Sequence, residues 1–308
     1  MTSRAPTALR ETDNVRAIGL IILSMALFVV EDLFIKLLSA PLQSAQVMVM
    51  FSTGGMVLFA LLALARRRAV FAAANWQRLP LIRGACEGIA SAGFFTAIVH
   101  ADLSLVTSIL MAMPIVVTAM AAIFLKEPVG LIRWSAVFIG FCGVLLIIRP
   151  SNADMPPQAL WMLVTVVAIA VRDLLTRFID TDAAPEVLSF QAYSATLIFG
   201  LTILVLSPQV IVAPSPAQLG MWITGVTFGA LGYLAIVTSM RIGEPSAVTP
   251  FRYVRLVFAL IIGAVFLGER PDLATLLGAL LIVGAGTAIT LRERRLNKAK
   301  RPLDPIKH

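Results

Sequence analysis

Two arginines lie inside an apolar stretch near the C-terminal end of this sequence. Arg252 and Arg255 are three residues apart, so on a helix they share one face, and no acid lies within one helical turn of them. A guanidinium stays protonated at physiological pH and offers a planar set of donors that suits a carboxylate or a phosphate. The pair therefore predicts a site that holds an anionic group. The alternative is a structural ion pair with Glu87.

Other ionisable residues also lie within apolar stretches, where a charge is costly unless it is paired or faces water. Glu31 and Arg172 occupy equivalent positions in two similar segments, and each is expected either to face a cavity or to be neutralised by a neighbouring helix. An acid four residues before a base favours an intrahelical ion pair. The spacing predicts two such pairs: Asp32 with Lys36, and Asp173 with Arg177.

Polar residues and prolines inside the same stretches complete the set of candidates. Hydrogen-bonding side chains that can line a cavity, or simply pack between helices, are Tyr253, Ser108 and Gln191, with Tyr193 and Tyr233. Pro114 and Pro250 each remove one backbone hydrogen bond and bend a helix, so they are expected as hinges or as plain kinks. Asp102, in a turn between two apolar stretches, is expected to cap a helix.

The composition says what kind of structure must position these residues. Apolar residues make up 59% of the 308 residues and charged residues only 14%, against about a quarter charged in soluble domains. Such a chain needs lipid as its solvent. Cys86 and Cys142 suggest no disulfide or metal framework, and no nucleophile, zinc or phosphate-loop motif is visible. No enzyme, no cofactor and no metal site is expected.

Ten apolar segments are each about 20 residues long, the length that crosses a bilayer as a helix. They are 16–37, 44–65, 79–99, 103–125, 131–149, 158–179, 186–206, 216–240, 245–267 and 272–291. Most of the 25 lysines and arginines fall on one side of these predicted spans. The positive-inside bias predicts that the tails, 1–15 and 293–308, are cytoplasmic. The net charge of +8 is thus a signal of topology and membrane lipid, not of nucleic acid.

The sequence repeats. Ala101–Glu127 aligns without a gap on Gly243–Glu269, and Val30–Leu33 aligns on Val171–Leu174. The predicted fold is therefore all-α and integral to the membrane, with two five-helix units, 16–149 and 158–292. Five is odd, so the second unit enters the membrane upside down relative to the first. Inverted-topology repeats of this kind are typical of transporters with a site where the halves meet.

The segment Phe124–Pro128, followed by Gly140–Pro150, resembles the drug/metabolite transporter superfamily and its ten-helix EamA-type members. The second half carries the matching segments Phe266–Pro271 and Gly278–Gly286, and Arg83-Gly84 resembles a feature of one bacterial subgroup. This resemblance implies a central cavity lined by helices of both repeats. It says little about the substrate.

Together these patterns predict a secondary transporter of the bacterial inner membrane that works by alternating access on a small anionic or zwitterionic metabolite. Arg252 and Arg255 would hold the anionic group, and Glu31 or Glu87 would meet a cationic group or a coupling proton. One alternative is a proton-coupled exporter of organic cations. A lipid flippase or a membrane subunit without transport activity is a further one. The sequence patterns do not specify the substrate, the coupling ion, the direction of transport or the oligomeric state.

Overall fold

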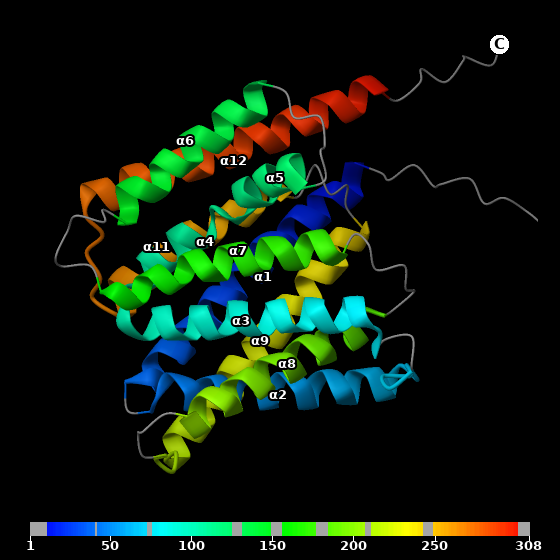
Figure 1. Cartoon of the computed structure of the whole chain (residues 1–308), viewed down its shortest axis with the longest axis vertical. Helices are drawn as coiled ribbons and strands as arrows, with labels where there is room; N and C mark the ends of the chain where they lie inside the picture. The colour runs from blue at the N-terminus through cyan, green and yellow to red at the C-terminus, as the bar shows by residue number, and fades with distance from the viewer. Residues whose placement is uncertain are drawn as a thin grey trace, which may run out of the picture.

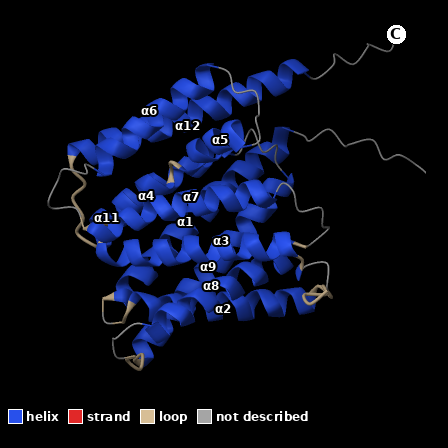
Figure 2. Ribbon diagram, viewed as in Figure 1, coloured by secondary structure: helices blue, strands red, loops and turns tan. Residues whose placement is uncertain are grey.

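The computed structural model describes residues 11–40, 42–72, 76–124, 131–148, 156–176, 184–206, 211–242 and 249–300. Within them every regular element is a helix, and the helices pack into one bundle (Figures 1 and 2). They are α1 (Glu11–Ser39), α2 (Ser44–Ala65), α3 (Arg78–His100), α4 (Leu103–Leu110), α5 (Met113–Phe124), α6 (Leu131–Ile148), η2 (Pro157–Leu160), α7 (Trp161–Thr176), α8 (Pro185–Leu206), α9 (Pro216–Ile242), η3 (Thr249–Tyr253), α11 (Val254–Phe266) and α12 (Leu273–Lys300).

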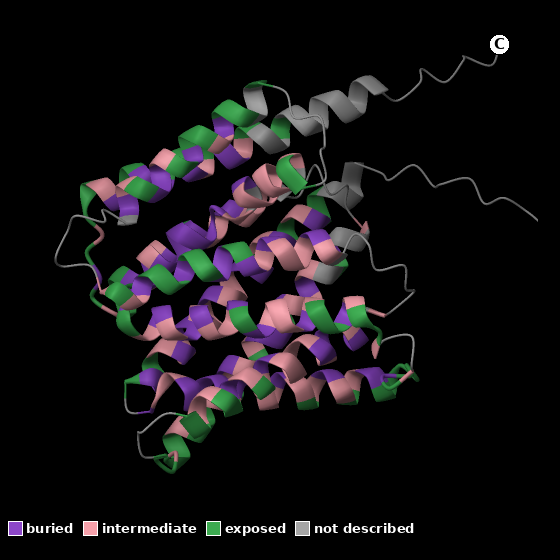
Figure 3. Cartoon of the chain, viewed as in Figure 1, coloured by how far each residue is buried: buried purple, intermediate pink, exposed green. Residues whose placement is uncertain are grey.

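The outer surface of the bundle is apolar. Leu131 is 88% exposed and Val205 is 81% exposed, and exposed residues follow the outward faces of the helices in Figure 3. Seven helical stretches are long and apolar enough to cross a bilayer, and α6 and α12 contain shorter apolar helices. An apolar exterior of this extent requires lipid around it. The chain is a multi-pass membrane protein, whereas the count of ten crossings stays a prediction.

The predicted span 103–125 is not continuous. It forms α4 and α5, with Met111 and Ala112 in a turn between them. Pro114 has no N–H to donate to the carbonyl oxygen of Leu110, so the ladder of helical hydrogen bonds is interrupted there. The bend expected at Pro114 is thus a break between two helices, and Leu103–Phe124 together still has the length of one span.

The equivalent helix of the second half changes from 3₁₀ to α at the equivalent place. There the 3₁₀ turn η3 passes into α11 between Tyr253 and Val254, which align on Met111 and Ala112 in the repeat. Pro250 lies inside η3. The two prolines are not at matching positions, yet a regular α-helix begins close to the same repeat position in both halves, at Met113 and at Val254.

Helix packing follows the two halves of the chain. In the first half the order is α1, α2, α3, α4/α5 and α6, and in the second it is α7, α8, α9, η3/α11 and α12. α1 packs on α9 and α3 packs on α7, α2 packs on α8, and α6 packs on α12. When each helix is replaced by its equivalent in the other half, the same pairings result. The pairing is that expected of two repeats related by a two-fold axis.

The first turn of α1 and the last turn of α12 lie at the same end of the bundle, at the right in Figure 1. We call this the terminus end, and the other the far end. α12 continues to Lys300, nine residues beyond the predicted end of its span at 291. The extension is rich in Arg, Glu, Leu and Lys, which favour helix even outside an apolar environment.

Candidate functional site

A cavity of about 530 Å³ lies in the middle of the bundle and is lined by helices of both halves. Four arginines and three acids line it, and apolar, aromatic, serine and threonine side chains form the rest of its wall. The charged residues are Arg83, Arg172, Arg252, Arg255, Glu31, Asp32 and Glu87. The lining thus carries a formal excess of positive charge, which favours a ligand with an anionic group.

The cavity lies closer to the terminus end than to the far end. Arg83 and Ser189 line it, and they lie only about 8 Å and 6 Å along the axes from the first residues of α3 and α8. Arg66, just after α2, forms an ion pair with Glu186 in the first turn of α8, so these helix ends meet at the terminus end.

Asp32 and Arg255 form one buried ion pair across the cavity wall. Arg255 Nη2 donates to Asp32 Oδ2 over 2.7 Å, and the side chains are 17% and 4% exposed. The Arg255 guanidinium also lies over the Phe28 ring, 5.6 Å from its centroid. The pair links α1 of the first half to α11 of the second.

The predicted intrahelical pair of Asp32 with Lys36 is not formed. Lys36 contacts Glu269 at 3.6 Å and donates to the Ala101 carbonyl oxygen, while Asp32 turns to Arg255. An intrahelical pair contributes only about 0.2–0.5 kcal/mol, so partners on neighbouring helices easily outweigh it. Asp173 accepts from the adjacent Arg172 over 2.7 Å. Arg177, its predicted partner, lies outside the described residues.

Glu87 also has a different partner from the one considered. Its carboxylate accepts from Arg172 Nη1 over 2.8 Å, not from Arg252 or Arg255. Arg172 therefore bridges Glu87 on α3 and Asp173 on α7. The first half offers Asp173 no equivalent of Arg255, because Met113 stands at that position of the repeat.

Arg252 and Glu31 are the remaining members of the predicted site. Both line the cavity and both are half-buried. Across the part of the chain that the structure describes, no hydrogen bond or ion pair engages the Arg252 guanidinium or the Glu31 carboxylate. Among the described residues, the Arg252 cation and the Glu31 acid of this cavity thus lie outside the hydrogen bonds and ion pairs that hold the other charges.

Three predicted site residues lie outside the cavity lining. Tyr253 is buried, with its hydroxyl against Gly286 of α12. Ser108 donates to the Ser104 carbonyl oxygen over 2.7 Å within α4. Gln191 lines a separate small groove between α3 and α8. Helix packing is the alternative that the sequence left open for these three residues.

Sequence reasoning missed Arg83 as a lining residue, because it was grouped with the basic residues outside the membrane. Its position four residues before Glu87 on α3 was an available signal, since the two share a helical face. Aromatic lining was also missed for the most part. Phe51, Phe94 and Phe95 form one cluster of rings, and the fully buried Phe59 packs against Tyr193 and Tyr233.

A model of the EamA-like transporter family matches residues 15–149 and, a second time, residues 157–291. The chain belongs to this family. The resemblance inferred from the repeated motifs is thereby confirmed, and a transporter family agrees with the expectation that the protein is not an enzyme. A solved crystal structure has the same fold as this EamA-like transporter, with a TM-score of 0.61 at 18% identity over 91% of this chain and 98% of that chain.

Two kinds of named relative are similar to this EamA-like transporter. The S-adenosylmethionine uptake transporter of Rickettsia prowazekii (strain Madrid E) is 24% identical over 201 residues, 65% of this chain and 67% of the relative. The riboflavin transporter of Vibrio cholerae serotype O1 is 25% identical over 197 residues, 63% of this chain and 64% of the relative. Both relatives carry small organic molecules.

The Glu31 carboxylate occupies space that a glycine leaves open. A Cβ atom at Gly229 of α9 would overlap the Glu31 carboxylate. We expect Gly229→Ala to destabilise the EamA-like transporter by about 1–3 kcal/mol, the usual cost of overpacking, because the carboxylate must leave its place. The measurement is the unfolding midpoint of detergent-solubilised protein.

Two further variants test this cause. Gly220→Ala, on the same helix but with open space around its Cβ, should leave the midpoint unchanged. Adding Glu31→Ala to Gly229→Ala should recover most of the lost stability, because the overlapping group is gone. A double variant as unstable as Gly229→Ala alone would show that the contact with Glu31 is not the cause.

Proposed function

We propose that this chain is a secondary transporter that carries a small zwitterionic or anionic organic metabolite across the bacterial inner membrane by alternating access. The observation that carries the proposal is the central cavity, built by both halves, in which Arg252 and Glu31 make no hydrogen bond or ion pair with the described residues. Arg252 would bind the carboxylate of the substrate. Glu31 would bind its cationic group or a coupling proton.

The other charged residues of the lining have supporting roles in this proposal. Arg255 is held by Asp32, and Arg172 is held by Glu87 and Asp173, so these groups set the shape and potential of the cavity. They would meet the substrate only if it displaced their partners. We therefore assign the first contact with an anion to Arg252, where the sequence had assigned it to both arginines of the pair.

Size and chemistry suggest a first ligand to test. The cavity is within the range of about 300–1,000 Å³ that holds small organic ligands. S-adenosylmethionine, carried by one relative, has a carboxylate, two cationic groups and a planar ring. Riboflavin, carried by the other, has a planar ring and no carboxylate. A cavity with Arg252, Glu31 and aromatic walls is complementary to the first of these.

The proposed topology follows the two halves. Units 16–149 and 158–292 would each cross the membrane five times in opposite senses, with both tails in the cytoplasm. The common position of the start of α1 and the end of α12 supports this arrangement. The interruptions at Met111–Ala112 and Tyr253–Val254 are proposed as the hinges, which refines the hinge roles predicted for Pro114 and Pro250.

Export of an organic cation is the second candidate, and Glu31 in the cavity lining favours it. Uptake into proteoliposomes containing the full chain separates the two. We expect labelled S-adenosylmethionine to enter protein-containing liposomes, and tetraethylammonium not to. Entry of tetraethylammonium, abolished by Glu31→Gln and indifferent to Arg252→Gln, would establish the second candidate instead. No solute uptake together with scrambling of labelled lipid would indicate a flippase.

A further inference from the structure

The carboxylate of Glu269, in the second half, caps a helix of the first half. It accepts from Leu103 N over 2.5 Å, from Ser104 N over 3.1 Å and from Ser104 Oγ over 2.7 Å. These backbone N–H groups belong to the first turn of α4, where N–H groups have no hydrogen-bond acceptor within the helix itself. The expected cap, Asp102, makes no side-chain hydrogen bond to them. A negative charge at a helix N-terminus is favourable, and this one is buried.

Lys36 of α1 joins the same contact. Its ammonium group lies 3.6 Å from Glu269 Oε1 and donates to the carbonyl oxygen of Ala101, in the turn between α3 and α4. Partial burial and the nearby Glu269 carboxylate raise the pKa of Asp102, while Lys36 acts in the opposite sense. We call Glu269, Lys36 and the Ala101–Ser104 turn the clasp. It connects α1, α3 and α4 to the segment after α11.

Local sequence explains how Glu269 reaches the turn. Leu267 N and Glu269 N both donate to the Gly263 carbonyl oxygen, over 3.1 Å and 2.9 Å, so the chain folds back at the end of α11. Gly268 has φ +66°, a left-handed conformation that glycine adopts without strain. A Cβ atom at Gly263 would overlap Glu269 Oε2. Gly268 therefore allows the turn that brings Glu269 to α4, and Gly263 leaves room for its carboxylate.

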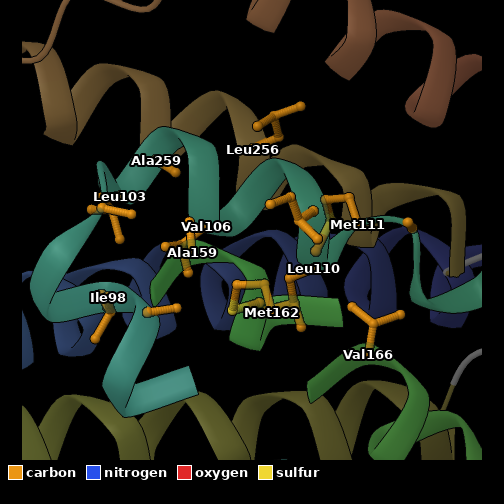
Figure 4. Close-up of a cluster of buried hydrophobic side chains, with 14 of the residues drawn as sticks. Ile98, Leu103, Val106, Leu110, Met111, Ala159, Met162, Val166, Leu256 and Ala259 are labelled. Carbon is orange, nitrogen blue, oxygen red and sulfur yellow. The ribbon is translucent and has the colours of Figure 1, made fainter. Parts of the chain in front are cut away.

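The clasp lies at the far end of the bundle. Lys36 is in the last turn of α1, and the clasp includes the end of α3 and the start of α4. Next to the clasp lies a group of apolar side chains that we call the apolar plug: Ile98, Val106, Met162, Leu256 and Ala259, part of the buried cluster drawn in Figure 4. Most of these side chains are fully buried. Ile98, Met162 and Ala259 lie farther towards the far end along their helices than the cavity-lining Phe95, Thr165 and Arg255.

We propose that Glu269 is the positioning residue of the far-end gate: its clasp keeps the apolar plug closed, and opening towards that face requires the carboxylate to leave the α4 turn. The inference rests on the proposed alternating access. Substrate makes no contact with Glu269. Because the clasp joins the two halves, relative movement of the halves at the far end must break its hydrogen bonds. Removing the charge therefore shifts the population towards the open far-end gate.

The test measures access to the cavity from the far-end face. In full-length protein carrying Cys86→Ser and Cys142→Ser, Ser91→Cys places a thiol on the cavity lining. A membrane-impermeant maleimide is applied from the face opposite the termini. Glu269→Gln is expected to raise the labelling rate about tenfold, because hydrogen bonds to a charged group are among the stronger ones in proteins. Gly263→Ala should act in the same direction, since it displaces the carboxylate without removing its charge.

The matched control is Glu186→Gln, which removes the charge of an ion pair that also joins the two halves but lies at the terminus end. It should leave far-end labelling unchanged. Monodisperse Glu269→Gln protein that labels no faster than the parent would overturn the proposal, as would equal acceleration by Glu186→Gln. Labelling does not depend on which solute is carried. If no solute crosses and labelling still responds to Glu269→Gln, the proposed substrate is wrong and the gate stands.

Discussion

Arg252→Gln is expected to weaken binding of S-adenosylmethionine about 10- to 100-fold. A hydrogen bond to a charged group contributes about 1.5–3 kcal/mol, and about 1.4 kcal/mol corresponds to a factor of ten. Among the described residues no acid is paired with Arg252, so the variant removes a cation without leaving a buried carboxylate unpaired. The fold should therefore survive. The measurement is the dissociation constant by calorimetry or by ligand-dependent thermal shift, which follows affinity by mass action.

The matched ligand is decarboxylated S-adenosylmethionine, which lacks only the carboxylate. Wild-type protein should prefer the carboxylated form, and Arg252→Gln should bind both forms with similar affinity. Arg252→Lys should retain part of the preference, because an ammonium group keeps the charge and loses the planar donor geometry. Equal preference for the carboxylated ligand in wild type and in Arg252→Gln would exclude Arg252 as its partner.

Asp32→Asn should cause the largest loss of stability of any single change considered. It removes the partner of Arg255 and leaves a buried guanidinium without its counter-charge, at a cost of about 3–5 kcal/mol. Arg255 Nε has no hydrogen-bond partner in the described residues, so the guanidinium has little other support. The unfolding midpoint of detergent-solubilised protein, or denaturant titration, reports the change.

Removing both charges should be milder than removing one. Asp32→Leu combined with Arg255→Met replaces the pair by apolar groups, and such replacements of buried pairs are often neutral or stabilising. The double variant should therefore be more stable than either single variant, with a coupling free energy of about 1–3 kcal/mol. Additive effects of the two substitutions would mean that the ion pair does not determine stability here.

The sequence was most informative about the helices and the halves. Apolar length alone located each predicted span on a helix or on a broken pair of helices, because a bilayer requires a nearly fixed number of residues. The self-alignment of Ala101–Glu127 on Gly243–Glu269 anticipated the repeated family match. The break at Met111–Ala112 was less accessible, since a proline bends a helix by an amount that its neighbours decide.

The structure brings part of the predicted site together and pairs its charges differently. Arg252, Arg255, Glu31, Glu87 and Arg172 all line one cavity, because buried charges must meet one another or water. Which charge meets which depends on the rotation of each helix about its axis, and spacing along the chain does not determine that rotation. Spacing therefore paired Asp32 with Lys36 instead of Arg255. It also did not predict the hydrogen bond between Glu269 of the second half and Ser104 of the first.

The Asp32–Arg255 bridge has no mirror image, because Leu110 and Met113 occupy the places of Arg252 and Arg255 in the first half. In a carrier with two identical inverted halves, exchanging their shapes would give inward and outward forms of equal free energy. Here the two arginines belong to one half only, so under the proposed alternating access the inward and outward forms would differ in free energy. The proposal thus implies an intrinsic resting orientation, and a difference of only ~1.4 kcal/mol would already favour one form tenfold.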